Sequence, residues 1–393
     1  MVSNYSLVPK KEIEKRHGQL RKKLSKLDVS GVLLFSTVEI FYYSGIGLEG
    51  ALYIPQEGEP IHLVKRNIEL ATEFSSISNI IYFGRLSQIF DTLKINARSK
   101  IGVELDILPY SHVEFLKTLK KEITLVNVNQ FLRKQRAVKT NYEISQIKMA
   151  AKLVDQSFEY CLEIATPEMT EIELAAKLDK WLLNNGHRGY ITTRAFNSAL
   201  LNFSYVISKS SSILNIHFTP ISGWGLSLKY PYGPSTQKIG KDPFFVDTCG
   251  NYNGYISDTT RTFVHGKFDP ETRYQLEALQ HVKQLLLKEL KPGINLGEVY
   301  TRAMNLANEL GISNNFMGEA NDKVQFLGHG VGLELDELPI LYAKGGQTES
   351  GNILACEPKF IEKGRKVLGI EDTYAITESG THLLSQSPDY FEI

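Results

Sequence analysis

The sequence lacks most of the features that mark secreted, membrane-bound or nucleic-acid-binding proteins. Its three cysteines include no C-x-x-C pair, which is typical of reduced thiols in a cytosolic protein. The first residues lack the apolar stretch and cleavage site of a signal peptide, and no apolar run is long enough to span a bilayer. Lysine plus arginine and aspartate plus glutamate both number 44, so no general attraction to nucleic acid or anionic lipid is expected. These absences predict a soluble, cytoplasmic chain with neither nucleic acid nor a membrane as its partner.

One basic segment, residues 10–26, is a possible exception. Its apolar residues Ile13, Leu20 and Leu24 recur at helical spacing. This pattern favours an amphipathic helix with a solvated charged face over a nucleic-acid-binding arm.

The chain is long enough for one very large domain or two ordinary ones, and a change of pattern near residue 138 favours two. Residues 1–138 alternate short apolar segments with polar amphipathic ones, as in an α/β layer domain. The expected strands are 31–36, 51–55, 61–65, 79–84, 100–104 and 123–128.

Residues 139–393 contain an internal repeat of helix, helix and β-rich segment. In its first copy, capping patterns at Thr140 and Thr170 each open a helix. In its second copy, Asp269 and Asn295 open two more helices, which end near Leu290 and Gly311. We therefore predict an α+β domain of two pseudo-symmetric halves whose acidic hairpins meet at one central site.

These β-rich segments carry four carboxylates and one imidazole in apolar surroundings. Isolated acids usually lie in solvated turns, but that interpretation does not explain apolar neighbours around every one of them, where an unpaired charge is costly. Two divalent cations about 3.5–4 Å apart would compensate the charges and could activate one water. This donor set suits Mn or Fe, with Co or Zn also possible. The candidate ligands are Asp247, Asp258, His329, Glu357 and Glu371.

The spacing of the candidate ligands has a structural reason. Ten residues rich in glycine and asparagine separate Asp247 from Asp258, so the two carboxylates can meet across an antiparallel hairpin. His329 lies between Gly328 and Gly330, which permits a close approach of backbone. Cys249 is expected on the same face as Asp247, either near the metals or simply as a packed small residue.

The ordered motifs VD-x10-D, TTRTF, GHGVGLE, EP and IED resemble metallopeptidase family M24, which includes methionine aminopeptidases, prolidases and Xaa-Pro aminopeptidases. The similarity to the prolidase-type branch covers nearly the whole chain, including FYYSG and the junction RAVKTNYEISQIKMAA. It implies an α/β N-terminal domain followed by a pita-bread catalytic domain with two pseudo-symmetric halves. It also implies a homodimer in which the N-terminal domain borders the partner's active site.

The resemblance also implies roles for the five ligands. Asp247 would be a terminal ligand of one metal, and Asp258 and Glu371 would bridge both. His329 and Glu357 would complete the second metal, with Glu357 also moving the proton of the bridging water. The implied reaction is metal-dependent cleavage of an N-terminal peptide bond in a short peptide, as in an Xaa-Pro aminopeptidase or dipeptidase.

The residues that would bind substrate depart from the family pattern. Asp336 stands where the family has a histidine seven residues after the ligand histidine, and Gly369 stands where dipeptide-cleaving prolidases have an arginine. A further family histidine corresponds to Tyr230 by spacing, or to His217 in IHFTP by local motif. Asp336, His217 and Tyr230 are therefore the candidate substrate-binding residues.

Two alternatives to a peptidase follow from these departures. The first is another enzyme class on the same scaffold, such as a creatinase-like C–N hydrolase or a lyase. The second is a non-catalytic binding module. The presence of all five ligands weighs against the second alternative, because such relatives typically lose ligands.

Overall fold

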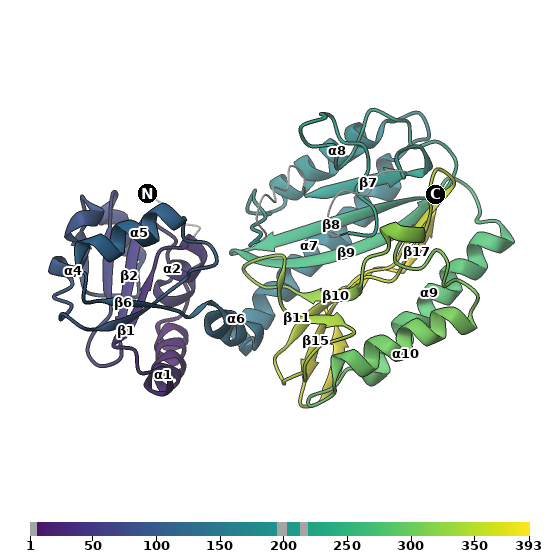
Figure 1. Ribbon diagram of the computed structural model, residues 1–393. Helices are drawn as coiled ribbons and strands as arrows, with labels where there is room; N and C mark the ends of the chain where they lie inside the picture. The colour runs from purple at the N-terminus through teal and green to yellow at the C-terminus, as the bar shows by residue number, and fades with distance from the viewer. Residues whose placement is uncertain (1–5, 195–202, 213–218) are drawn as a thin grey trace. The chain divides into compact units, whose positions relative to one another are not determined.

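The computed structural model describes residues 6–194, 203–212 and 219–393 of the chain (Figure 1). The chain forms two compact units, Met1–Gln135 and Arg136–Ile393. Within the described residues, no helix has both the length and the apolar character that a membrane crossing requires.

The first unit is built on a six-stranded mixed sheet with the order β4-β3-β2-β1-β5-β6. All six strands expected from the sequence are present, because each apolar run packs against one core. Leu33, Leu63 and Ile101 are buried in it, and Ile81 and Leu125 of the edge strands are partly buried against it. The predicted amphipathic helix is also present, with Ile13, Leu20 and Leu24 buried. The strands are β1 (Gly31–Leu34), β2 (Gly50–Pro55), β3 (Ile61–Val64), β4 (Ile80–Tyr82), β5 (Lys100–Val103) and β6 (Thr124–Asn127). The helices are α1 (Lys10–Leu27), α2 (Thr37–Ser44), α3 (Ile68–Phe74), α4 (Ile89–Thr92), α5 (Tyr110–Leu119) and α6 (Asn129–Ala137), of which α6 runs on into the second unit.

The second unit contains the predicted repeat of two helices followed by β structure. The first half contains α7 (Asn141–Ile164), α8 (Glu171–Asn184), β7 (Ser204–Ser208), β8 (Phe244–Tyr252) and β9 (Tyr255–Val264). Complete capping boxes at Thr140 and Thr170 start its two helices. The side chains of Asp269 and Asn295 cap α9 (Pro270–Glu289) and α10 (Leu296–Glu309) of the second half. Its strands are β10 (Phe326–Gly330), β11 (Glu337–Tyr342), β12 (Ile353–Cys356), β13 (Lys359–Glu362), β14 (Lys366–Gly369), β15 (Asp372–Thr377) and β16 (Gly380–Leu383).

Each half packs its helix pair against its own sheet. Helices α7 and α8 cover the sheet β17-β9-β8-β7, in which β17 (Tyr390–Glu392) comes from the end of the chain (Figure 1). Helices α9 and α10 pack against the sheet β11-β10-β12-β15-β16. The two sheets meet where β9 lies beside β15, because the Thr373 hydroxyl donates to the Asp258 carbonyl over 2.9 Å. The fold is therefore an α/β N-terminal domain followed by a pita-bread domain with two pseudo-symmetric halves.

Candidate metal centre

The β8–β9 hairpin brings Asp247 and Asp258 to one face in a diagonal register. An Asn253-Gly254 turn, with φ of 51° and 87°, joins the two strands, as expected for a two-residue hairpin loop. Asp258 on β9 lies directly opposite Cys249 on β8. Asp247 precedes Cys249 by two residues on β8. The Cys249 thiol donates to Asp258 Oδ1 over 3.4 Å. Cys249 is thus both a buried packing residue and a direct neighbour of a candidate ligand.

The second half supplies His329 from β10, with glycines that allow close strand contact. A Cβ on Gly328 would lie 2.4 Å from the Ala355 carbonyl oxygen of β12. A Cβ on Gly330 would lie 2.2 Å from the Leu338 carbonyl oxygen of β11. The close backbone approach expected from the sequence is therefore required on both sides of His329.

The ring of His329 is oriented for metal binding. Its Nδ1 lies 3.2 Å from the carbonyl oxygen of Gly330, which can only accept a hydrogen bond. Nδ1 therefore carries the proton, and the lone pair of Nε2 faces the site. Nε2 lies 3.8 Å from both Asp258 Oδ2 and Glu357 Oε1.

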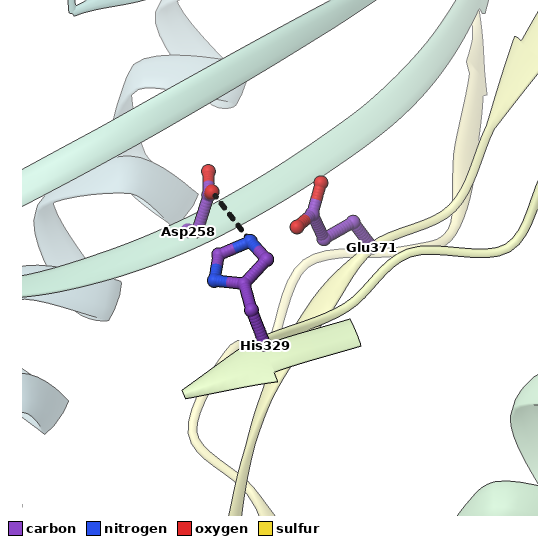
Figure 2. A group of neighbouring side chains, drawn as sticks. All are labelled: Asp258, His329 and Glu371. Atoms are coloured by element: carbon purple, nitrogen blue, oxygen red, sulfur yellow. Dashed lines mark ion pairs between the residues drawn. The ribbon is translucent and has the colours of Figure 1, made fainter. Parts of the chain in front are cut away.

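Three of the predicted ligands converge closely enough to hold one cation. Ligand atoms of Asp258, His329 and Glu371 all lie within 4.8 Å of one another, and Figure 2 shows the three side chains pointing toward one another. Glu371 Oε1 is buried and has no hydrogen-bond partner among the described residues. A cation bound by these three groups would give that oxygen a partner. The residues therefore fit one divalent metal ion at this position.

The space beside Asp247 contains a lysine ammonium group. Lys359 Nζ lies 3.1 Å from Asp247 Oδ2, 2.7 Å from Glu357 Oε2 and 3.1 Å from Glu371 Oε2. Sequence reasoning missed Lys359, although it lies two residues after Glu357 in the EPK motif. In an extended chain, residues two apart point to the same side.

Charge crowding shifts the pKa values of this group. Burial, and then the charges of Glu371 and Asp247, raise the pKa of Asp258 well above its usual range. Burial likewise raises the pKa of Glu371 to about 8, although Lys359 opposes the shift. Burial alone would lower the pKa of Lys359, but Asp247, Glu357 and Glu371 raise it well above the ordinary value. Burial therefore disfavours the ionised forms of Asp258 and Glu371, and a cation bound between them would favour these forms.

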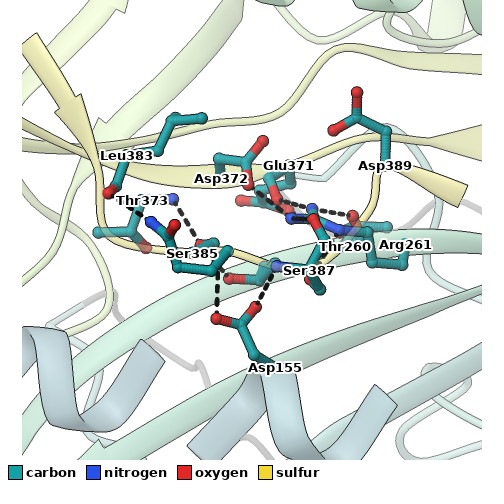
Figure 3. A network of polar contacts seen from close by, with 12 residues as sticks. Asp155, Thr260, Arg261, Glu371, Asp372, Thr373, Leu383, Ser385, Ser387 and Asp389 are labelled. Atoms are coloured by element: carbon teal, nitrogen blue, oxygen red, sulfur yellow. Dashed lines mark hydrogen bonds and ion pairs between the residues drawn. The ribbon is translucent and has the colours of Figure 1, made fainter. Parts of the chain in front are cut away.

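A buried arginine positions Glu371. Arg261 on β9 donates from Nη1 to the Glu371 carbonyl over 2.6 Å and from Nη2 to Asp372 Oδ1 over 2.6 Å (Figure 3). The Thr260 hydroxyl donates to Glu371 Oε2 over 2.7 Å. On the other side, Lys283 of α9 pairs with Asp372 Oδ2 at 2.7 Å. Both the backbone and the side chain of Glu371 are therefore fixed.

The candidate substrate residues have different surroundings. Asp336 is half-buried, and its Oδ1 accepts a hydrogen bond from the backbone N–H of Arg194 over 2.8 Å. Tyr230 is half-buried, and its ring centroid lies 6.4 Å from that of Tyr232. Burial raises the pKa of Tyr232, although the hydrogen bond that its hydroxyl accepts from Tyr205 over 3.0 Å lowers it. His217 lies outside the described residues.

A buried ion-pair network supports the segment that carries Asp336. Glu337 pairs with Arg136 and Lys139 at 2.9 Å each, and Arg136 also pairs with Glu334. Glu337 Oε1 accepts hydrogen bonds from the backbone N–H groups of Leu333 and Glu334. The RAVK motif at the junction thus fixes the loop that follows His329.

The sequence matches two family models. Residues 145–378 match metallopeptidase family M24, and residues 16–138 match the creatinase/prolidase N-terminal domain. The Xaa-Pro dipeptidase of Pyrococcus furiosus is 26% identical over 381 residues, covering 95% of this chain and 99% of that one. An uncharacterized peptidase of Bacillus subtilis is 25% identical, covering 94% of this chain and 97% of that one.

Solved structures show the same fold. The prolidase from Pyrococcus horikoshii OT3 has a TM-score of 0.79 at 23% identity, covering 95% of this chain and 99% of that one. The X-Pro aminopeptidase from Thermotoga maritima has a TM-score of 0.77 at 20% identity, covering 94% of this chain and all of that one (100%). Because this family model matches more than half of the chain, the chain belongs to metallopeptidase family M24.

Proposed function

We propose that the chain is a metal-dependent hydrolase that cleaves an N-terminal peptide bond of a short peptide, with the Xaa-Pro bond as its first candidate. The observation that carries the proposal is the convergence of Asp258, His329 and Glu371 within 4.8 Å, with one Glu371 oxygen left without a partner in the described chain. The names of the relatives, which include Xaa-Pro dipeptidases and a prolidase, support the substrate class.

The chain's own groups divide the chemistry between them. A bound divalent cation would polarise the scissile carbonyl and lower the pKa of water. Asp258, His329 and Glu371 would hold that cation, and Arg261 keeps Glu371 in place. Glu357 Oε1 faces His329 Nε2 at 3.8 Å, so this carboxylate is placed to accept a proton and return it to the leaving amine.

Several sequence-based predictions remain part of this proposal. Oxygen and imidazole donors suit Mn, Fe, Co or Zn. The motifs alone predict two such ions, and the three converging ligands provide a site for one of them. The proposal also includes a homodimer in which residues 1–138 border the partner's site. A cytoplasmic location agrees with the free thiols of all three cysteines.

The substrate end of the site favours a peptide without a nearby free carboxylate. A dipeptide places its C-terminal carboxylate beside the scissile bond, where an arginine is the best partner. Gly369 offers no side chain there, and Asp336 adds a negative charge. We therefore propose a preference for longer or carboxyl-blocked peptides over Xaa-Pro dipeptides.

A substrate panel tests this function. The metal-stripped protein, resupplied with Mn²⁺ or Co²⁺, is incubated with Xaa-Pro dipeptides, longer Xaa-Pro peptides and creatine, and products are separated by chromatography. Release of the N-terminal residue from the longer peptides is expected. Cleavage of creatine alone would favour the C–N hydrolase, which the changes at Asp336 and Gly369 keep as the second candidate. No cleavage of any substrate with any metal would overturn the proposed function.

A further inference from the structure

We propose that the ammonium group of Lys359 takes the place of one of the two metal ions, so that each chain binds a single divalent cation at Asp258, His329 and Glu371. The inference rests on the proposed function only in assuming that this three-residue site binds a metal. It replaces the sequence-based expectation of two ions with one ion and one built-in positive charge.

The position of Lys359 Nζ is the first argument. An ammonium group has three donors, and here the three acceptors come from different segments: Asp247 on β8, Glu357 after β12 and Glu371 before β15. A divalent ion bound by Asp247 and Glu371 would have to lie roughly 2.0–2.3 Å from the same oxygens. Two positive groups cannot share that space, so the ammonium excludes the ion that Asp247 would hold.

Repulsion between positive charges in a buried site is the second argument. The site contains four carboxylates, from Asp247, Asp258, Glu357 and Glu371. One divalent cation together with Lys359 leaves one negative charge, and two cations together with Lys359 would leave one excess positive charge. Both totals are one charge from neutral, so it is the repulsion between a second ion and the ammonium sharing its oxygens that excludes the second ion. Lys359, Glu357 and Glu371 have side chains only 3%, 5% and 1% exposed, so water screens this repulsion poorly.

The fixed path of the Lys359 side chain is the third argument. Lys359 lies directly opposite Gly369 in the β13–β14 pair. A Cβ at residue 369 would lie 3.3 Å from Lys359 Cγ and 2.8 Å from Thr260 Cγ2, so a side chain there would crowd the lysine stem. The Phe245 ring lies on another side, with its centroid 5.9 Å from Nζ. Lys359 is therefore built into the site and does not reach it from the surface.

Metal stoichiometry tests the inference without using activity. The full-length protein is stripped with a chelator, loaded with excess Mn²⁺ and freed of unbound metal. Manganese per chain is then measured by mass spectrometry, and the electron paramagnetic resonance spectrum is recorded. The wild-type chain should bind one Mn²⁺ and show the spectrum of an isolated ion. Lys359→Met keeps the length of the stem but removes the charge, so this variant should bind two and show an exchange-coupled pair.

Lys366→Met is the matched control. Lys366 is a buried lysine on the same hairpin, but its Nζ donates to Gln275 over 3.0 Å, away from the ligands. This variant should bind one Mn²⁺, as the wild type does. Lys359→Gln serves as a second variant if Lys359→Met does not fold.

The outcomes distinguish a failure of this inference from a failure of the proposed function. Two Mn²⁺ per wild-type chain would overturn the role of Lys359 and leave the metal-dependent hydrolase intact. One Mn²⁺ in both the wild type and the folded Lys359 variants would also overturn it. A wild-type chain that binds no Mn²⁺, Co²⁺ or Zn²⁺ would overturn the proposed function and the inference together.

Discussion

Lys359 and Gly369 lie opposite each other across the β13–β14 pair, and the missing side chain of Gly369 gives the stem of Lys359 its path to the carboxylates. The glycine that replaces the expected arginine and the lysine among the ligands are thus one structural feature. The chain lacks a positive charge at residue 369, where an arginine would bind the substrate carboxylate. It has a positive charge on Lys359, beside the metal ligands.

Removing a ligand charge should abolish activity while preserving the fold. Asp258→Asn and Glu371→Gln each replace a carboxylate with a neutral amide that cannot compensate a cation. Burial, and then the charge of Glu371, raise the pKa of Asp258, so losing one of these two negative charges relieves repulsion in the metal-free protein. We expect a loss of at least about 100-fold in metal affinity and in peptide hydrolysis, with an unchanged circular dichroism spectrum. Near-normal turnover by either variant would show that these residues do not hold the metal.

Substituting Asp336 should change the preference between dipeptides and longer peptides. Asp336→His removes a negative charge near the dipeptide carboxylate and supplies an imidazole, so dipeptide kcat/KM should rise about tenfold, equivalent to about 1.4 kcal/mol. Asp336→Asn is the matched control, since it removes the charge but retains an oxygen that can accept the hydrogen bond from Arg194. Efficient wild-type cleavage of free dipeptides, unchanged by Asp336→His, would refute the charge argument.

The buried Glu337 network should make stability depend on acidic pH. Burial would raise the pKa of Glu337, but Arg136 and Lys139 lower it from 4.5 to about 2. The folded state therefore binds this proton less readily than the unfolded state. The stabilisation is complete above about pH 4.5 and is lost as the pH falls toward 2.

Glu337→Gln isolates this contribution. It leaves Arg136 and Lys139 buried without their shared carboxylate, so the free energy of unfolding at neutral pH should fall by about 3–5 kcal/mol. The variant should also lose part of the acid dependence between pH 4.5 and 2. Urea unfolding across this pH range measures both effects, and equal curves for the two proteins would contradict the prediction.

Assembly gives a further prediction. If residues 1–138 border the partner's site, sedimentation equilibrium should show a species of twice the chain mass of 44.3 kDa. A single species of 44.3 kDa at micromolar concentration would refute the dimer.

The sequence predicts the elements and motifs of this chain better than the contacts between them. The six strands of the first unit follow from apolar runs, and the helix starts at Thr140 and Thr170 follow from capping patterns. The diagonal register of Asp247 and Asp258 depends on where the Asn253-Gly254 turn closes, which ten intervening residues leave open.

Other features depend on contacts between distant segments. Lysine is normally a surface residue, so nothing in EPK alone indicates an ammonium group among carboxylates from three segments. The link between Asp336 and Arg194 joins residues 142 positions apart, and no local pattern encodes it.

The most direct test of one metal ion in a working hydrolase is a stoichiometric activation curve. Metal-free protein, at a concentration well above the metal dissociation constant, is titrated with Mn²⁺, and hydrolysis of a longer Xaa-Pro peptide is measured after each addition. We predict that activity rises linearly and stops rising at one Mn²⁺ per chain. A break at two Mn²⁺ per chain, or no activity at any ratio, would contradict this account.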